Sequence, residues 1–203
     1  MQKIWAPLIA GGSSPFSERT RRRLLRESRA MFFHAYDSYM ALGYPLDGLR
    51  PQSCVGDNSQ GGAALTLFDA LDSLVLLGAP EAFRDAVNRV LSDFKVCATP
   101  ATARQCAHHA ATAQDFDIDA RVHVFEMTIR TLGGLLSAHS LILQSPELVP
   151  GYSGGLLTLA EDLTRRLLPA FDTATGLPLS WVNLKHGAGG AVQCSFRTDD
   201  AVV

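Results

Sequence analysis

Apolar residues recur every three to four positions along most of this 203-residue chain, and this period restricts its fold more than any other feature. Such spacing places apolar side chains on one face of an α-helix, whereas a half-buried strand would show alternation. The pattern predicts helices over 17–42, 63–77, 80–91 and 154–168, and a further one between about 120 and 143. Because the links are mostly short and no βαβ alternation occurs, the predicted class is all-α, built from antiparallel helical hairpins.

The predicted helix that ends near Leu143 contains a glycine pair, Gly133 and Gly134. Each glycine inside a helix costs about 1 kcal/mol relative to alanine. We therefore expect another backbone to approach closely at this pair. The apolar face expected on this helix consists of Phe125, Ile129, Leu132, Leu136 and Leu141.

Composition excludes several classes of protein. The chain is 47% hydrophobic, and its 18 basic residues are balanced by 20 acidic ones, so nucleic acid is not an expected partner. No stretch approaches the roughly 20 apolar residues of a transmembrane segment. Residues 1–16 are interpreted as a flexible N-terminus or a signal remnant, the basic run 19–26 as a solvated helix face, and the Ala- and Thr-rich segment 95–114 as an inserted loop.

Charged residues occur where apolar ones would cost less: Asp69 and Asp72 on the apolar 63–77 helix, and Glu126 and Arg130 on the later one. Acids that face the interior of a helical assembly indicate a polar central site. The alternative for Glu126 and Arg130 is a surface ion pair, since their i,i+4 spacing stabilises a helix by about 0.2 to 0.5 kcal/mol. The alternative for the two aspartates is capping or bridging of neighbouring helices.

Histidines and cysteines give weaker signals. His34 and His186 are interpreted as hydrogen-bonded core histidines rather than ligands. The even number of cysteines matches no zinc module and leaves the redox compartment open. One group in the inserted loop fits either a metal site or a disulfide between its two cysteines: Cys97, Cys106, His108 and His109.

Several blocks of sequence stand in a fixed order along the chain: FFHAYDSYM, RPQSC, LTLFDALDSL, DFDIDARVHVFEMTIRTLGGLLSAH, LLPAFDTATGLP and WVNLKHG. Together they resemble, in the same order, the class I α-mannosidases of glycoside hydrolase family 47, and the similarity covers about residues 28–187. The DFDID start, the VNLKHG end and the RPQSC cysteine are most similar to the endoplasmic reticulum degradation-enhancing α-mannosidase-like proteins. The resemblance implies that 17–203 is the N-terminal part of a catalytic domain, an (α/α) toroid that is incomplete here.

The resemblance also implies an activity: inverting hydrolysis that trims α-1,2-linked mannose from N-glycans of misfolded glycoproteins. By position, Glu126 matches the general acid of the family, Arg130 an arginine that contacts mannose, and Asp72 an acid of the same cavity. The general base and the calcium-binding threonine of the family are expected beyond Val203, so the 203-residue chain alone is expected to be inactive and to hold no ligand for the Ca²⁺ cofactor. Cys54 is expected to pair with a cysteine beyond the end of the chain.

The implied partners are high-mannose N-glycans and an oxidoreductase, and the implied location is the endoplasmic reticulum lumen. Two alternatives remain at this stage. One is a mannose-glycan-binding or adaptor protein without turnover, acting in endoplasmic reticulum-associated degradation. The other is a helical scaffold for protein partners, which would need an exposed apolar groove and no inward acids.

Overall fold

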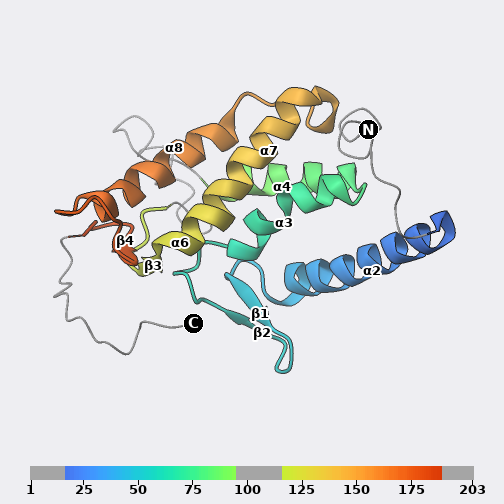
Figure 1. Ribbon diagram of the computed structural model, residues 1–203, viewed down its shortest axis with the longest axis horizontal. Coiled ribbons are helices and arrows are strands. Elements are labelled where there is room, and N and C mark those ends of the chain that lie inside the picture. Colours follow the sequence, from blue (N-terminus) through green and yellow to red (C-terminus); the bar gives the residue numbers. More distant parts are fainter. Residues whose placement is uncertain (1–16, 95–115, 189–203) are drawn as a thin grey trace. The chain divides into compact units, whose positions relative to one another are not determined.

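The computed structural model describes residues 17–94 and 116–188, which form mainly helices with short strands (Figure 1). The chain divides into two compact units, Met1–Asp37 and Ser38–Val203. The predicted loop at 95–114, residues 1–16, and Cys97, Cys106 and Cys194 lie outside the described residues. Within the described part, no helix is both long and apolar enough to span a bilayer.

The first unit contains most of helix α2, Glu18–Leu42, which begins one residue after the predicted start. The Ser17 hydroxyl accepts a hydrogen bond from the backbone N–H of Thr20 at 3.2 Å, as an N-cap residue does. Glu18 accepts hydrogen bonds from Arg21 at 2.8 Å and Arg22 at 2.6 Å, and these hold the pKa of its carboxyl at about 2. The arginines of the basic run 19–26 are exposed along this helix.

The second unit consists of helical hairpins, as the periodicity predicts. Helix α3, Leu65–Leu76, turns at Gly78 into α4, Pro80–Asp93, with Pro80 at the start of the helix. Helix α7, Gly133–Gln144, is joined to α8, Gly155–Leu167, through the 3₁₀ turn η2, Pro146–Leu148. Helix α3 also packs against α7, so the hairpins share one apolar core (Figure 1). The all-α class is confirmed.

The helix predicted between 120 and 143 is shorter and less regular than expected. It follows strand β3, Arg121–His123, and consists of α6, Val124–Glu126, the π-helical turn η1, Met127–Leu132, and α7. A π turn contains an extra residue, so the 3.6-residue period does not hold across it.

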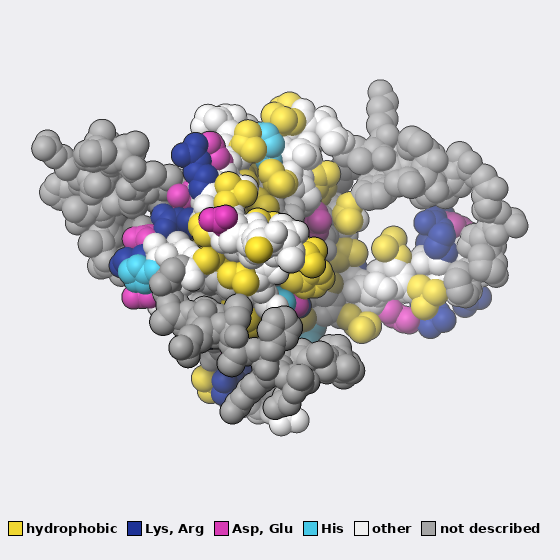
Figure 2. All heavy atoms as spheres, turned by 60° about the vertical axis from the view of Figure 1, so that its left-hand side comes forward, with side chains coloured by type: hydrophobic (Ala, Val, Ile, Leu, Met, Phe, Trp, Pro, Cys, Tyr) yellow, Lys and Arg dark blue, Asp and Glu magenta, His cyan; other side chains and the backbone are white. Residues whose placement is uncertain are grey.

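The apolar face predicted for this helix is wrong for most of its residues. Phe125, Ile129 and Leu136 are 60%, 51% and 41% exposed. Met127, Gly134, Leu135, Ala138 and Ile142 are buried instead. The segment is apolar on more than one side, and the small residues Gly134 and Ala138 allow the closer packing. Hydrophobic side chains consequently remain visible at the surface of this unit among charged ones (Figure 2).

The closest approach between helices occurs where α7 crosses α3. A Cβ atom added to Gly134 would lie 2.2 Å from the carbonyl oxygen of Phe68, far inside van der Waals contact. At Gly133 the nearest atom, the carbonyl oxygen of Thr128 in the preceding turn, would be 3.6 Å away. The predicted close approach is therefore confirmed at Gly134 alone.

Two antiparallel ribbons flank the helices. Strand β1, Gly48–Arg50, pairs with β2, Val55–Asp57. Strand β3 pairs with β4, Trp181–Asn183, and the 3₁₀ turn η3, Leu168–Phe171, lies between α8 and β4. In the β3–β4 ribbon Val122 opposite Val182 is buried, so this side faces the core.

Hydrogen bonds that start from Asp47 connect the loop before α3 to strand β3, which precedes α6. It is almost fully buried, and its carboxylate accepts backbone hydrogen bonds from Gln60 at 2.7 Å and Gly62 at 3.0 Å. The side-chain oxygen of Gln60 then accepts from the backbone N–H of His123 at 2.9 Å. Since charge-assisted hydrogen bonds to backbone N–H groups are strong, this chain of contacts holds β3 in place.

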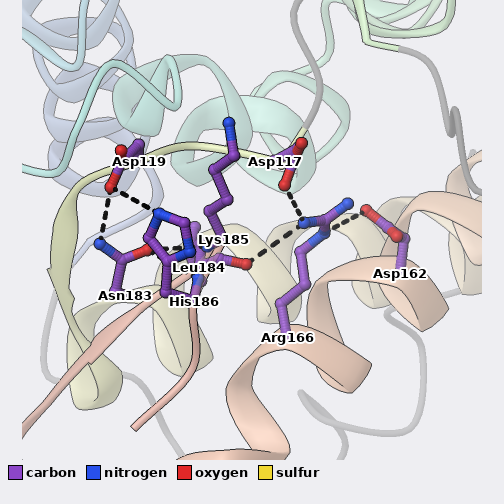
Figure 3. Close-up of polar contacts among 8 residues, drawn as sticks. All are labelled: Asp117, Asp119, Asp162, Arg166, Asn183, Leu184, Lys185 and His186. Atoms are coloured by element: carbon purple, nitrogen blue, oxygen red, sulfur yellow. Dashed lines mark hydrogen bonds and ion pairs between the residues drawn. The ribbon is translucent and has the colours of Figure 1, made fainter. Parts of the chain in front are cut away.

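A polar network ties the segment before β3 to the segment after β4 (Figure 3). Arg166 on α8 donates to Asp162 and Asp117, each at 3.0 Å, and to the Leu184 carbonyl at 3.2 Å. The Asn183 amide donates to Asp119 at 3.0 Å, and its carbonyl oxygen accepts from the backbone N–H groups of 185 and 186. The DFDID and VNLKHG blocks of the sequence are therefore neighbours in space.

Replacing Gly134 tests the contact between α3 and α7. Gly134→Ala should force these helices apart and destabilise the intact protein by about 3 kcal/mol or more. Gly133→Ala is the matched control, because its added methyl group meets only ordinary contacts and gains about 1 kcal/mol of helix propensity. Denaturant unfolding measures both variants, and equal stabilities would contradict the close approach.

The pH dependence of stability tests the network at Asp119. The hydrogen bond from Asn183, with further contributions from His186 and Lys185, holds the pKa of Asp119 below its ordinary value. The resulting stabilisation is present above the unfolded pKa of about 3.9 and is lost as the pH falls through the lower folded pKa. Asp119→Asn should therefore reduce the fall in melting temperature between pH 5 and pH 3, whereas Asp172→Asn at an exposed position should leave it unchanged. If the melting temperatures of the two variants depend on pH in the same way, Asp119 contributes nothing to the pH dependence of stability.

Candidate functional site

A cluster of charged side chains forms where α3, α6 and η1 meet. Asp69 and Asp72 come from α3, Glu126 is the last residue of α6, and Arg130 lies in η1. The Arg130 guanidinium donates from Nε to the Glu126 carboxylate at 2.6 Å, and its Nη1 lies 3.6 Å from Asp69 Oδ2. The structure therefore brings together residues that are far apart in the sequence.

Asp72 on α3 accepts hydrogen bonds from serines on both helices of the close contact, α3 and α7. The Ser137 hydroxyl on α7 donates to Asp72 Oδ2 at 3.2 Å, and the neighbouring Ser73 hydroxyl donates to Oδ1 at 3.3 Å. Sequence reasoning did not single out Ser137, which lies one helical turn beyond Gly134. The bridging role that we considered for Asp72 is thus present, and it does not prevent the remaining lone pairs from binding a ligand.

The cluster is partly open to solvent. The side chains of Glu126, Arg130 and Asp69 are 30%, 42% and 51% exposed. Burial raises the pKa of the Asp69 carboxyl, Arg130 opposes this shift, and the nearby charges of Asp72 and Glu126 reinforce it. A raised carboxyl pKa in a group of mutually interacting acids is typical of functional sites, although ion-pair networks produce it as well.

The surface ion-pair interpretation of Glu126 and Arg130 accounts for only part of this geometry. An ordinary pair of the same spacing exists on α8, where Arg165 donates to Glu161 at 2.6 Å and both side chains are well exposed. Arg130 differs because it also faces Asp69 across the helix contact, with Asp72 nearby on α3. Two carboxylates from different helices at one guanidinium exceed what an i,i+4 pair within a single helix requires.

This arrangement suits the recognition of a polyhydroxylated molecule. Carboxylates accept hydrogen bonds from hydroxyl groups, and a guanidinium donates to hydroxyl oxygens through a rigid fork of N–H groups. A carboxyl group within reach of a glycosidic oxygen can also donate a proton to a leaving group. The site therefore has the groups needed for binding a sugar and for one half of an acid–base hydrolysis.

The remaining candidate residues contribute no metal site within 17–94 and 116–188. In these ranges no three His, Cys, Asp or Glu side chains converge as ligands for an ion. His34 and His186 are exposed, so their interpretation as core histidines is wrong; His186 lies 3.4 Å from Asp119. Cys54 is an exposed free thiol, and its pairing with a cysteine beyond Val203 stays a prediction. His108 and His109 lie outside the described residues.

Comparison with known proteins identifies a family. Residues 31–200 match glycosyl hydrolase family 47. An alpha-mannosidase I, MNS4, of Arabidopsis thaliana is 45% identical over 168 residues, which are 82% of this chain and 24% of the relative. The human ER degradation-enhancing alpha-mannosidase-like protein 2 is 44% identical over 179 residues, which are 87% of this chain and 27% of the relative.

The fold has a counterpart among solved structures. An alpha-1,2-mannosidase from Trichoderma reesei superposes with a TM-score of 0.64 at 24% identity, covering 83% of this chain and 31% of that chain. This likeness confirms that the hairpins form part of an (α/α) toroid. The chain spans about a quarter of the length of the curated relatives named above. The match to the family covers most of the chain, so the chain belongs to glycosyl hydrolase family 47.

Proposed function

We propose that this chain contributes the general-acid side of a glycosidase that removes α-1,2-linked mannose from N-glycans. The observation that supports this most is the position of Glu126, which is hydrogen-bonded to Arg130 and interacts electrostatically with Asp69 on another helix. The family and the names of its mannosidase relatives supply the class of substrate. The complete hydrolysis of the mannoside is part of this proposal.

In the proposed reaction Glu126 donates its proton to the glycosidic oxygen as the bond to the leaving sugar breaks. In an inverting glycosidase a second carboxylate activates water on the opposite face of the ring, about 6.5 to 9.5 Å from the acid. Asp69 interacts electrostatically with Glu126 and Asp72, and we assign both aspartates to binding. The base is expected outside this chain.

Arg130 and Asp72 hold the mannose in this proposal. The Arg130 guanidinium can donate to ring hydroxyls, and a bound sugar then competes with Glu126 for these N–H groups. This competition frees the Glu126 carboxyl from its charged partner at the moment when it must hold a proton. Asp72, oriented by Ser137, accepts a hydrogen bond from a hydroxyl of the same ring.

Family 47 mannosidases are generally calcium-dependent, and calcium is part of the proposal for the intact protein. Ca²⁺ prefers six to eight oxygen ligands. Within the described ranges no group of three carboxylate or histidine ligands exists to hold it, so the residues present do not fit the ion. None of the steps above involves a metal.

Location and partners follow from the relatives in the same way. Several relatives are named ER degradation-enhancing proteins, in human, Schizosaccharomyces pombe and Saccharomyces cerevisiae. We place this protein in the endoplasmic reticulum, acting on high-mannose glycans of misfolded glycoproteins. An oxidoreductase partner is part of the same proposal.

Replacing Glu126 tests the proposed role. In the intact protein Glu126→Gln should lower the rate of mannose release from a high-mannose N-glycan by at least about 100-fold, because the amide cannot donate the proton. Glycan binding should persist, since glutamine keeps the size of the side chain. Mannose release is measured by chromatography of the labelled glycan, and binding by calorimetry.

Glu161→Gln provides the matched control. Glu161 forms an i,i+4 pair of the same 2.6 Å length with Arg165 but has no neighbouring acid from another helix in this pair. Its replacement should change the rate less than about twofold, as expected for an exposed ion pair. If Glu126→Gln behaves like Glu161→Gln, the ion pair at Glu126 is merely structural. If the unaltered protein binds the glycan but releases no mannose, the adaptor alternative is favoured.

A further inference from the structure

The outer side of the β3–β4 ribbon carries an aromatic and polar surface that the proposed catalytic groups do not use. Because Val122 and Val182 face the core, the alternation of a strand places their neighbours on the opposite side. These neighbours are Arg121 and His123 on β3, and Trp181 and Asn183 on β4, which pair in register. We call these residues the ribbon platform.

The rings of the ribbon platform contact one another and leave part of Trp181 exposed. The His123 ring lies edge-on to Trp181 at 4.9 Å between ring centroids, and the Arg121 guanidinium stands 5.6 Å from the Trp181 ring centroid. Trp181 is 38% exposed in spite of these contacts. The exposed part of the indole ring offers an aromatic surface on which a ligand can stack.

Polar groups of both kinds border the rings. Arg121 is exposed and offers N–H donors, whereas the Asp119 carboxylate, joined to Asn183 at 3.0 Å, offers acceptors. The carboxylate would repel an anionic ligand. Hydroxyl groups both donate and accept, so this border suits a sugar. The apolar C–H face of a pyranose ring can also lie on the negatively polarised face of an indole.

The ribbon platform is continuous with the proposed site. His123 immediately precedes α6, and Glu126 follows one helical turn later, a rise of about 5 Å along the axis. Phe125, the residue before Glu126, is exposed and lies edge-on to His123 at 6.5 Å between centroids. A glycan whose terminal mannose reaches Glu126 therefore extends within reach of β3 and β4.

We propose that the ribbon platform binds a second hexose ring of the same branched glycan, with Trp181 as the stacking surface and Arg121 and Asn183 as hydroxyl contacts. This inference rests on the proposed function, because it places the reacting mannose at Glu126. Trp181 is a residue for recognition of the extended glycan and takes no part in bond cleavage. It thus favours long, branched substrates over disaccharides.

A comparison of substrates tests this inference in the intact protein. With Trp181→Ala, the KM for a high-mannose N-glycan should rise about 5- to 10-fold, while kcat and the kinetics with α-1,2-mannobiose remain unchanged. Trp181→Phe should restore most of the affinity. Phe171→Ala removes an exposed aromatic ring on η3 outside the ribbon platform. This variant should leave KM and kcat unchanged for both substrates.

The possible results separate the two proposals. If Trp181→Ala is active and its KM values are unchanged, the ribbon platform alone is overturned. Equal losses of activity with both substrates would overturn it too, because they indicate a structural role for Trp181. An unaltered protein that neither binds nor cleaves either sugar would overturn the proposed function and the platform together. Fluorine NMR of 5-fluorotryptophan-labelled protein adds a direct readout. The Trp181 signal is identified by its absence from Trp181→Phe, and it should shift when the glycan binds.

Discussion

The contact between the α3 and α7 backbones at Phe68 and Gly134 determines the geometry of the site. No side chain larger than hydrogen fits at Gly134, and the helices approach closely enough for Ser137 on α7 to reach Asp72 on α3. The same approach brings Arg130 within 3.6 Å of Asp69. A packing constraint in the core thus produces a concentration of charge beside it, which packing alone would disfavour.

Hydrogen bonds outside the helices position the turn that carries Glu126. Asp47 holds Gln60, and Gln60 accepts from the backbone of His123 immediately before α6. From the other side, Asp119 and Arg166 connect β4 and α8 to the strand that leads to the same turn. Glu126 therefore lies in a short helix whose approach is fixed on both sides, as a site requires when an acid must meet one particular oxygen.

Sequence periodicity predicted the all-α class and most helix positions, because apolar residues at intervals of three to four define a buried face on α3, α4 and α8. It failed at Phe125 and Ile129, since a π turn breaks the period and the segment is apolar on several sides. Gly134 was informative because a glycine pair inside a helix needs a compensating contact. The approach of Asp69 to Arg130 and the anchoring by Asp47 depend on tertiary contacts, which spacing cannot reveal. Glu126, Arg130 and Asp72 were singled out as site residues by resemblance to the family.

The central claim is that the Glu126 carboxyl faces the glycosidic bond of a bound mannoside. The most direct measurement is a crystal structure of the intact protein with a sulfur-linked α-1,2-mannobiose, which resists hydrolysis. Our account predicts a Glu126 oxygen within about 3.5 Å of the linking sulfur, and Arg130 in contact with the terminal ring. A sugar bound elsewhere, with Glu126 directed to bulk solvent and paired only with Arg130, would contradict it.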